Sequence, residues 1–92
     1  MKTIHFPAFL LNKALNESGD TMELLQLRYF QTIAQFESVT QAASFYRIPQ
    51  SAMSQTLSRL EKELGYKLFE RKNNRIYLNN EGRVFLEAVN SA

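Results

Sequence analysis

The sequence has few of the residues from which covalent and metal-dependent sites are built. Its 92 residues include no cysteine, no tryptophan and a single histidine, His5. Without cysteine the chain cannot form a disulfide or a thiolate metal site, and one histidine does not supply the usual zinc ligand sets. We therefore expect no metal, no cofactor and no catalytic residue in this chain.

Long apolar runs are also missing. The apolar stretch at residues 4–11 is interrupted by His5 and Pro7, and it is far shorter than the roughly 20 residues that cross a bilayer. Its resemblance to a signal peptide is weak, because no pair of small residues marks a cleavage site after it. We expect no membrane segment and a cytoplasmic protein.

What remains has the composition of one small folded domain. Hydrophobic residues make up 45% and charged residues 22%, and the formal net charge is +2, values that disfavour disorder and coiled coil. Residues 1–21 carry two lysines against Glu17 and Asp20 and end in a polar stretch. We interpret them as a flexible, neutral N-terminal extension to a domain that begins near Met22.

Three helices are predicted between residues 24 and 64. Apolar residues follow helical spacing over 24–36, and residues 41–46 suit a short second helix capped by Ser38 or Thr40. Ala42 and Ala43 are small enough to let another helix approach closely. Pro49 then interrupts the pattern, and a third helix over about 51–64 is closed by Gly65. The second and third helices are therefore predicted to be joined by a short turn, as a helix-turn-helix.

The third helix has two different faces. One carries an apolar stripe at steps of four and three: Met53, Leu57, Leu60 and Leu64. The other carries Ser51, Ser54, Gln55, Ser58 and Lys62, where its first two turns offer short uncharged hydrogen-bonding groups. An ordinary solvated face is richer in Glu, Lys and Arg, so we interpret this face as a docking surface for base edges in a major groove.

A basic hairpin is predicted after Gly65. Two short β-prone runs, residues 66–71 and 75–78, flank Asn73 and Asn74, which suit a tight turn. From residue 47 to residue 75 seven basic side chains face three acidic ones, a local charge of +4. Placed beside the third helix, the hairpin tip is interpreted as a clamp for phosphates.

A last helix is predicted from Asn79 or Asn80 as its cap, with Glu81 in its first turn. Its apolar side chains are expected to need cover from the same domain or from a second copy. Two further interpretations concern single residues. Tyr29, Phe30 and Phe45 are expected to be core aromatics, and Glu61 and Glu63 to be solvated charges rather than a catalytic pair.

Four segments closely resemble the amino-terminal DNA-binding domain of LysR-type transcriptional regulators. They are MELLQLRYF at 22–30, SVTQAA at 38–43, QSAMSQTLSRLEKELG at 50–65 and LFER at 68–71. The resemblance implies a mainly α, winged helix-turn-helix fold with three helices and a two-stranded β-wing. Residues 22–79 would form this DNA-binding domain and residues 80–92 the start of a linker helix. It also implies sequence-specific binding of double-stranded DNA by a bacterial transcriptional regulator.

The resemblance also assigns site residues. The positions that match DNA contacts of the family are Thr40, Gln50, Ser51, Ser54, Gln55, Ser58, Arg59, Arg71, Lys72 and Arg75. Thr40 and Arg71 match phosphate contacts, and Lys72 and Arg75 match less regular contacts of the wing. Phe85, Leu86 and Val89 match the dimerisation role of the linker helix, which implies a homodimer.

Two departures from the family pattern affect individual roles. Pro49 stands where a capping serine is frequent, so Ser51 is expected to cap the third helix instead. Gln55 stands where many members have Arg, which shifts the expected base preference from guanine toward adenine. Family members also continue into a ligand-binding domain that this sequence does not contain, so we expect no small-molecule effector site here. The alternative function is a winged helix used for protein interaction or dimerisation, with the last helix as its contact surface.

Overall fold

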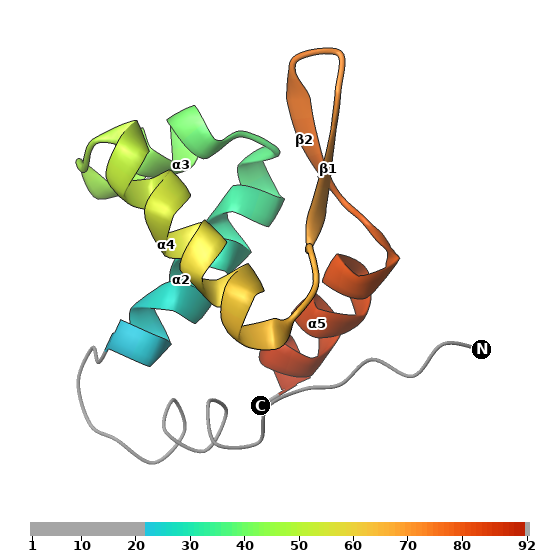
Figure 1. Ribbon diagram of the computed structural model, residues 1–92. Coiled ribbons are helices and arrows are strands. Elements are labelled where there is room, and N and C mark those ends of the chain that lie inside the picture. Colours follow the sequence, from blue (N-terminus) through green and yellow to red (C-terminus); the bar gives the residue numbers. More distant parts are fainter. Residues whose placement is uncertain (1–21, 92) are drawn as a thin grey trace.

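The computed structural model describes residues 22–91, with side chains from Leu24 onward, and this part of the chain folds into four helices and a two-stranded sheet (Figure 1). The elements are α2 (Met22–Phe36), α3 (Val39–Tyr46), α4 (Gln50–Leu64), β1 (Phe69–Lys72), β2 (Arg75–Leu78) and α5 (Asn80–Ser91). The predicted winged helix-turn-helix, mainly α, is confirmed. The extension predicted for residues 1–21 lies outside the described residues.

Helices α2, α3 and α4 pack together around one apolar core. The stripe predicted on α4 is confirmed, since all four of its apolar residues are buried. Ala42 and Ala43 of α3 are also buried, with 0% and 2% of their surfaces exposed. Because neither has a side chain beyond Cβ, α3 lies close against its neighbours, and this packing fixes the direction in which α4 presents its outer face.

The turn between α2 and α3 is set by Ser38. Its Oγ accepts a hydrogen bond from the Gln41 backbone N–H at 3.0 Å, which makes it the N-cap of α3. Of the two predicted caps, Ser38 is therefore the one used. Thr40 lies in the first turn of α3 with its side chain exposed.

Helix α4 begins one residue earlier than predicted, and its N-cap is Pro49. The Pro49 carbonyl accepts from the backbone N–H groups of Ala52 and Met53, at 3.1 and 3.2 Å, and none of the described side chains caps the helix. The expectation that Ser51 caps α4 is therefore wrong, because Ser51 already lies inside the first turn. At the other end Gly65 has φ 88°, a left-handed conformation that favours glycine.

The wing is an antiparallel hairpin in which Phe69 pairs with Leu78 and Lys72 with Arg75. Its two turn residues, Asn73 and Asn74, have φ of 54° and 63°. Positive φ at both positions is what a two-residue turn of this hand requires, and asparagine tolerates it. The predicted hairpin turn is confirmed, although β1 starts at Phe69 rather than at residue 66.

Helix α5 is attached at the base of the wing through Asn79. The Asn79 Oδ1 accepts from the Gly82 N–H at 2.7 Å, and its Nδ2 donates to the Lys67 carbonyl at 2.9 Å. Asn79 is thus the N-cap, one of the two predicted. Its second hydrogen bond joins α5 to the segment that leads into β1.

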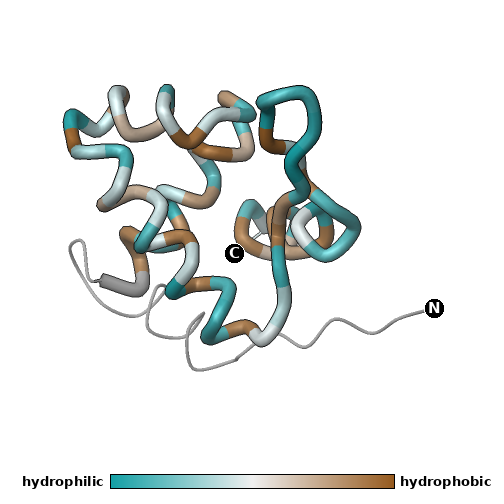
Figure 2. The backbone as a smooth tube through the Cα atoms, turned by 45° about the horizontal axis from the view of Figure 1, so that its top comes forward, coloured by the Kyte–Doolittle hydropathy of each residue, from teal (hydrophilic) through white to brown (hydrophobic). Residues whose placement is uncertain are grey.

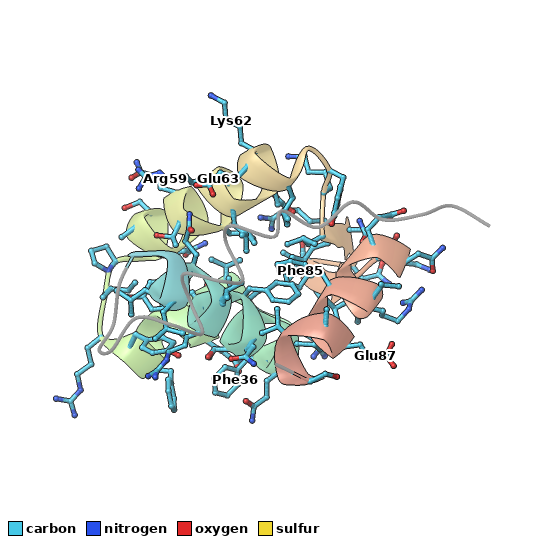
Figure 3. All side chains as sticks on the ribbon, turned by 90° about the horizontal axis from the view of Figure 1, so that it is seen from below. Phe36, Arg59, Lys62, Glu63, Phe85 and Glu87 are labelled. Carbon is cyan, nitrogen blue, oxygen red and sulfur yellow. The ribbon has the colours of Figure 1, made fainter. Side chains whose placement is uncertain are left out.

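Two aromatic residues lie where the sequence did not predict them. Phe85 is 1% exposed, and its ring centroid is 5.1 Å from that of Phe30; Figure 3 shows it pointing from α5 toward the core. The predicted dimer contact at Phe85 is therefore corrected to a core contact, because α5 folds back onto its own domain. Phe45 was expected in the core, but it is 64% exposed and lies at the edge of α3, where its ring centroid is 5.9 Å from that of Phe36 at the end of α2.

Candidate nucleic-acid interface

The outer face of α4 carries the hydrogen-bonding side chains that the sequence predicted for it. Gln50, Ser51, Gln55 and Ser58 are exposed, and Ser54 is half-buried. Arg59 and Lys62 point away from the core on the same helix (Figure 3). Because the Met53 and Leu57 stripe fixes the buried side, these polar groups are held together on one rigid surface.

The hydroxyl and amide groups of this face are available to a ligand. Thr56, on the same helix, donates its hydroxyl to the Ala52 carbonyl at 3.0 Å. By contrast, within the described part of the chain the side chains of Ser51, Ser54, Gln55 and Ser58 make no hydrogen bond. Serine and glutamine side chains both donate and accept, so the face can pair with the mixed donors and acceptors of a base-pair edge.

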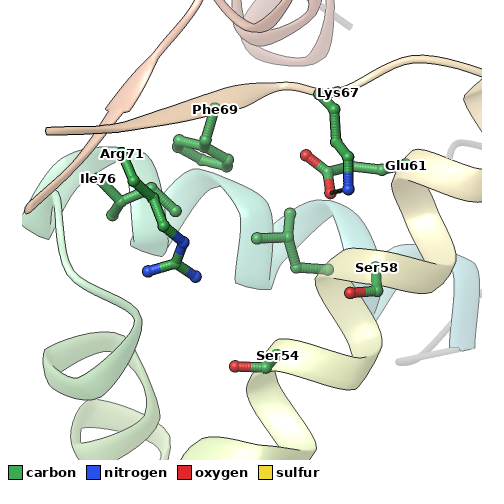
Figure 4. A pocket seen from close by; sticks show the side chains of 8 residues that line it. Ser54, Ser58, Glu61, Lys67, Phe69, Arg71 and Ile76 are labelled. Carbon is green, nitrogen blue, oxygen red and sulfur yellow. Dashed lines mark ion pairs between the residues drawn. The ribbon is translucent and has the colours of Figure 1, made fainter.

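A cleft of about 290 Å³ separates α4 from the wing, as Figure 4 shows. Its lining residues come from both elements: Ser54, Leu57, Ser58, Glu61, Lys67, Phe69, Arg71 and Ile76. The Arg71 guanidinium points into the cleft from the wing, opposite the hydroxyls of Ser54 and Ser58 (Figure 4). A cation facing two hydroxyls is an arrangement that suits an anionic oxygen.

Glu61 closes one end of this cleft and ties the wing to α4. Its Oε2 accepts from the Leu68 backbone N–H at 2.8 Å, and its Oε1 lies 3.9 Å from Lys67 Nζ. Only 9% of Glu61 is exposed, so the interpretation of this residue as a solvated charge is wrong. A buried carboxylate needs partners of this kind to offset its desolvation, and removing it would leave the Leu68 N–H unpaired.

The three basic residues of the wing tip do not form one cluster. The tip as a whole is hydrophilic (Figure 2), but side chains alternate between the two faces of the hairpin. Arg71 shares a face with the buried Phe69 and Ile76, toward α4. Lys72 and Arg75 lie on the opposite face, directly across from each other.

Arg75 is paired with a residue that sequence analysis missed. Its Nη2 lies 3.1 Å from Glu37 Oε1, and its guanidinium lies 5.9 Å from the centre of the Tyr77 ring. Glu37 follows the last residue of α2 and stands 38 positions from Arg75. No local pattern signals such a contact, because only the folded arrangement of α2 and the wing brings the two together.

Near the base of the wing, burial raises the pKa of the Tyr66 hydroxyl above its ordinary value of 10.0, and the negative charge of Glu81 raises it further.

Between residues 22 and 91, no three His, Cys, Asp or Glu side chains lie together in a way that could hold a metal ion. None of the helices in that part of the chain is long and apolar enough to cross a membrane.

Comparison with known proteins places these features in one family. Residues 24–83 match the model of the bacterial regulatory helix-turn-helix proteins of the lysR family. The HTH-type transcriptional regulator YybE of Bacillus subtilis is 47% identical over 68 residues, which are 74% of this chain and 23% of that protein. The chain spans about a quarter of the length of such curated relatives.

Two solved structures have a similar fold. One is the BenM DNA-binding domain in complex with catB site 1 DNA, with a TM-score of 0.70 and 34% identity over 74% of this chain and 76% of that one. The other is the CbnR DNA-binding domain in complex with DNA, with a TM-score of 0.69 and 31% identity over 73% and 77%. With the family model covering most of the described residues, the chain belongs to the lysR family of bacterial regulatory helix-turn-helix proteins.

Proposed function

We propose that this chain is the sequence-specific DNA-binding head of a bacterial transcriptional regulator, acting on double-stranded DNA in the cytoplasm. The observation that carries the proposal is the set of hydroxyl and amide groups on α4 beside the Arg71 cleft, which have no hydrogen-bond partner in the described part of the chain. The similarity to domains solved with DNA supports it. The relatives are named as transcriptional regulators, which supports a binding rather than a catalytic role.

In this proposal α4 enters the major groove, and its face reads base edges. The reading residues are Gln50, Ser51, Ser54, Gln55 and Ser58. Ser51 is included because it is exposed and does not cap α4. Gln55 pairs with adenine, whose N6 and N7 offer one donor and one acceptor to an amide.

The phosphate contacts come from elements on either side of α4. Arg71 lies in the cleft wall, Lys72 is exposed on the wing, and Arg59 extends from α4. Thr40 lies in the first turn of α3, where the helix dipole and its free N–H groups favour an anion. These contacts position the domain without selecting a sequence.

The salt dependence of binding tests this proposal directly. If about four to six phosphates are neutralised per copy, log K falls with log salt concentration at a slope of about −4 to −5. Anisotropy of a labelled duplex, measured at several salt concentrations, gives this slope. A slope near zero for the unmodified protein would rule the proposal out.

Two substitutions separate positioning from reading. Arg71→Ala should weaken binding to all duplexes alike and make the slope shallower by about one. Gln55→Ala should instead cost roughly 1–3 kcal/mol on the preferred duplexes selected from a random pool and little on others. Gln35→Ala is the matched control, because Gln35 is an exposed glutamine of α2 outside this surface. Equal losses on every duplex for Gln55→Ala would remove its reading role.

We also propose that residues 22–79 carry recognition and that residues 80–92 begin a linker helix through which two copies associate. Because Phe85 is buried, the contact between the two copies would be made by the apolar side chains that are exposed on α5. Val84 is 49% exposed, and Leu86 and Val89 are half-buried. Sedimentation of the protein over a range of concentrations, with Val84→Ser and Val89→Ser as variants, tests this. Self-association unchanged by both variants would contradict it.

A further inference from the structure

The contact between Glu37 and Arg75 joins the end of α2 to the second strand of the wing. It combines the ion pair at 3.1 Å with a long hydrogen bond of 3.5 Å from the Ile76 backbone N–H to the Glu37 carbonyl. Glu37 has φ 53°, a left-handed conformation that turns the chain at the end of α2. One residue thus reaches β2 through both its backbone and its side chain.

Two cations of the wing lie close enough for the Glu37 carboxylate to reduce their repulsion. Lys72 and Arg75 are directly opposite in the register of the hairpin, and like charges in that position repel. The Glu37 carboxylate offsets the repulsion from the Arg75 side. Lys72 is exposed to solvent. Of the two opposed cations, Arg75 therefore has a carboxylate beside it through the Glu37 pair, and Lys72 faces water.

The pair also changes what Arg75 can offer to DNA. A phosphate that binds Arg75 must displace Glu37, or else accept a carboxylate as a close neighbour of like charge. Arg71 instead faces the hydroxyls of Ser54 and Ser58 across the cleft (Figure 4), and the Glu61 carboxylate at the end of that cleft is bound to the Leu68 N–H rather than to Arg71. The wing's cations are therefore unequal as phosphate ligands.

We propose that Glu37 is a positioning residue that holds Arg75 out of the phosphate contacts, so that the wing meets DNA through Arg71 and Lys72. The proposal rests on the DNA binding proposed above. It assigns Arg75 to holding β2 against α2, and it makes Glu37 a determinant of how strongly the domain binds duplex DNA of any sequence.

The test is a double-mutant cycle with Glu37→Gln, Arg75→Gln and the combination of the two. The probe is a fluorescein-labelled duplex of mixed sequence, and the readout is the slope of log K against log salt. Arg75→Gln alone should leave the slope unchanged. Glu37→Gln should steepen it by about 0.9, the change for one added phosphate contact, and the combination should return it to the unmodified value.

Glu70→Gln is the matched control. Glu70 is an exposed glutamate on the same face of the wing as Arg75, but it is not the ion-pair partner of Arg75. The substitution Glu70→Gln removes one negative charge, as Glu37→Gln does. Its effect on binding should therefore be the same with and without Arg75→Gln, whereas the effect of Glu37→Gln should depend on Arg75.

Thermal unfolding without DNA tests the pair itself. If the contact forms in solution, the two single variants lower Tm and the combination lowers it no further than the larger single effect. Fully additive shifts would overturn the proposal, and so would a slope that becomes shallower by about one in Arg75→Gln. A flat salt profile for the unmodified protein would instead contradict the proposed DNA binding. Failure of the proposed function can therefore be told apart from failure of the Glu37 proposal.

Discussion

Gly82 lies where α5 crosses the segment that leads into the wing, and backbone atoms already fill the space beside it. A Cβ at this position would lie 2.0 Å from the Leu68 carbonyl oxygen and 2.9 Å from Leu78 Cδ2. The same carbonyl accepts the Asn79 N–H at 3.0 Å. The absence of a side chain at Gly82 is therefore what lets α5 dock at the base of the hairpin.

Gly82→Ala should destabilise the domain by about 1–3 kcal/mol, the usual cost of overpacking. The loss should appear even though alanine favours helix over glycine by about 1 kcal/mol. Urea denaturation measures it. Glu87→Ala is the control, because it introduces the same residue at an exposed position of the same helix and should change stability by less than about 0.5 kcal/mol. A Gly82→Ala protein as stable as the unmodified one would refute the steric argument.

The polar residues of the interface differ in whether the chain already uses them. Thr56 satisfies its hydroxyl on its own helix, while Ser51, Ser54, Gln55 and Ser58 do not. Since these groups have no hydrogen-bond partner among residues 22–91, a base edge could pair with them without breaking a contact in that part of the domain.

At the level of elements, α5 belongs to the same core as the helix-turn-helix. The Phe85 ring packs against Phe30 at 5.1 Å, and Leu86 and Val89 pack partly against the same cluster. A hydrogen bond of 2.8 Å from Gln31 Nε2 to Asn90 Oδ1 joins α2 to the far end of α5. A displacement of α5 would therefore break contacts of this core and the hydrogen bond to α2.

Phe85→Ala should cost about 3–5 kcal/mol of folding stability, because it removes a fully buried ring. Phe85→Leu, which keeps most of the apolar volume, should cost less than about 1.5 kcal/mol. Val84→Ala, one residue away and half-exposed, should be nearly neutral. Denaturant unfolding followed by circular dichroism provides the comparison. Unchanged stability in Phe85→Ala together with lost self-association would restore Phe85 as a dimer contact.

The helices could be predicted from the sequence because their signals are local. Met53 and Leu57 repeat at the helical period, Gly65 marks a helix end, and Asn73 with Asn74 marks a tight turn, so each element is visible within a few neighbouring residues. The buried face of α4 follows from the same period.

The contacts that position the wing could not be predicted in this way. Glu61 looks like one more charge on a polar stretch of helix, and only the fold places it against the Leu68 N–H. Glu37 and Arg75 are 38 residues apart, and their pairing depends on where the hairpin leaves the core. For Phe85 the helical spacing leaves open which surface covers the side chain, and the family resemblance points to a partner copy, whereas the fold buries it in its own domain.

At the scale of the whole molecule, charge is distributed unevenly around a small total. The chain has a formal net charge of +2, yet residues 47–75 carry +4 by the count of their basic and acidic side chains. Two of those four charges lie on the wing and one on Lys67, which lines the cleft, whereas the two basic and two acidic side chains of α4 cancel. Such a concentration steers an anionic duplex to one face and falls off with added salt.

Alkaline pH gives a test of the fold that does not involve DNA. The pKa of Tyr66 lies above 10.0 because of burial and, to a lesser extent, the charge of Glu81. A tyrosine whose pKa is higher in the folded than in the unfolded chain contributes stability below its unfolded pKa. That contribution is lost as pH rises through the folded pKa. The unmodified protein should therefore lose stability above about pH 10 more steeply than Tyr66→Phe.

The measurement is the urea midpoint of both proteins at a series of pH values from neutral to above 10. Below pH 10 the difference between them should be constant, since it reports only the contacts of the hydroxyl group. Above pH 10 the difference should shrink, because only the unmodified protein must ionise Tyr66. Glu81→Gln should move this change to lower pH by removing the neighbouring negative charge. A difference that stays constant throughout would show that Tyr66 ionises as freely in the folded chain as in the unfolded one.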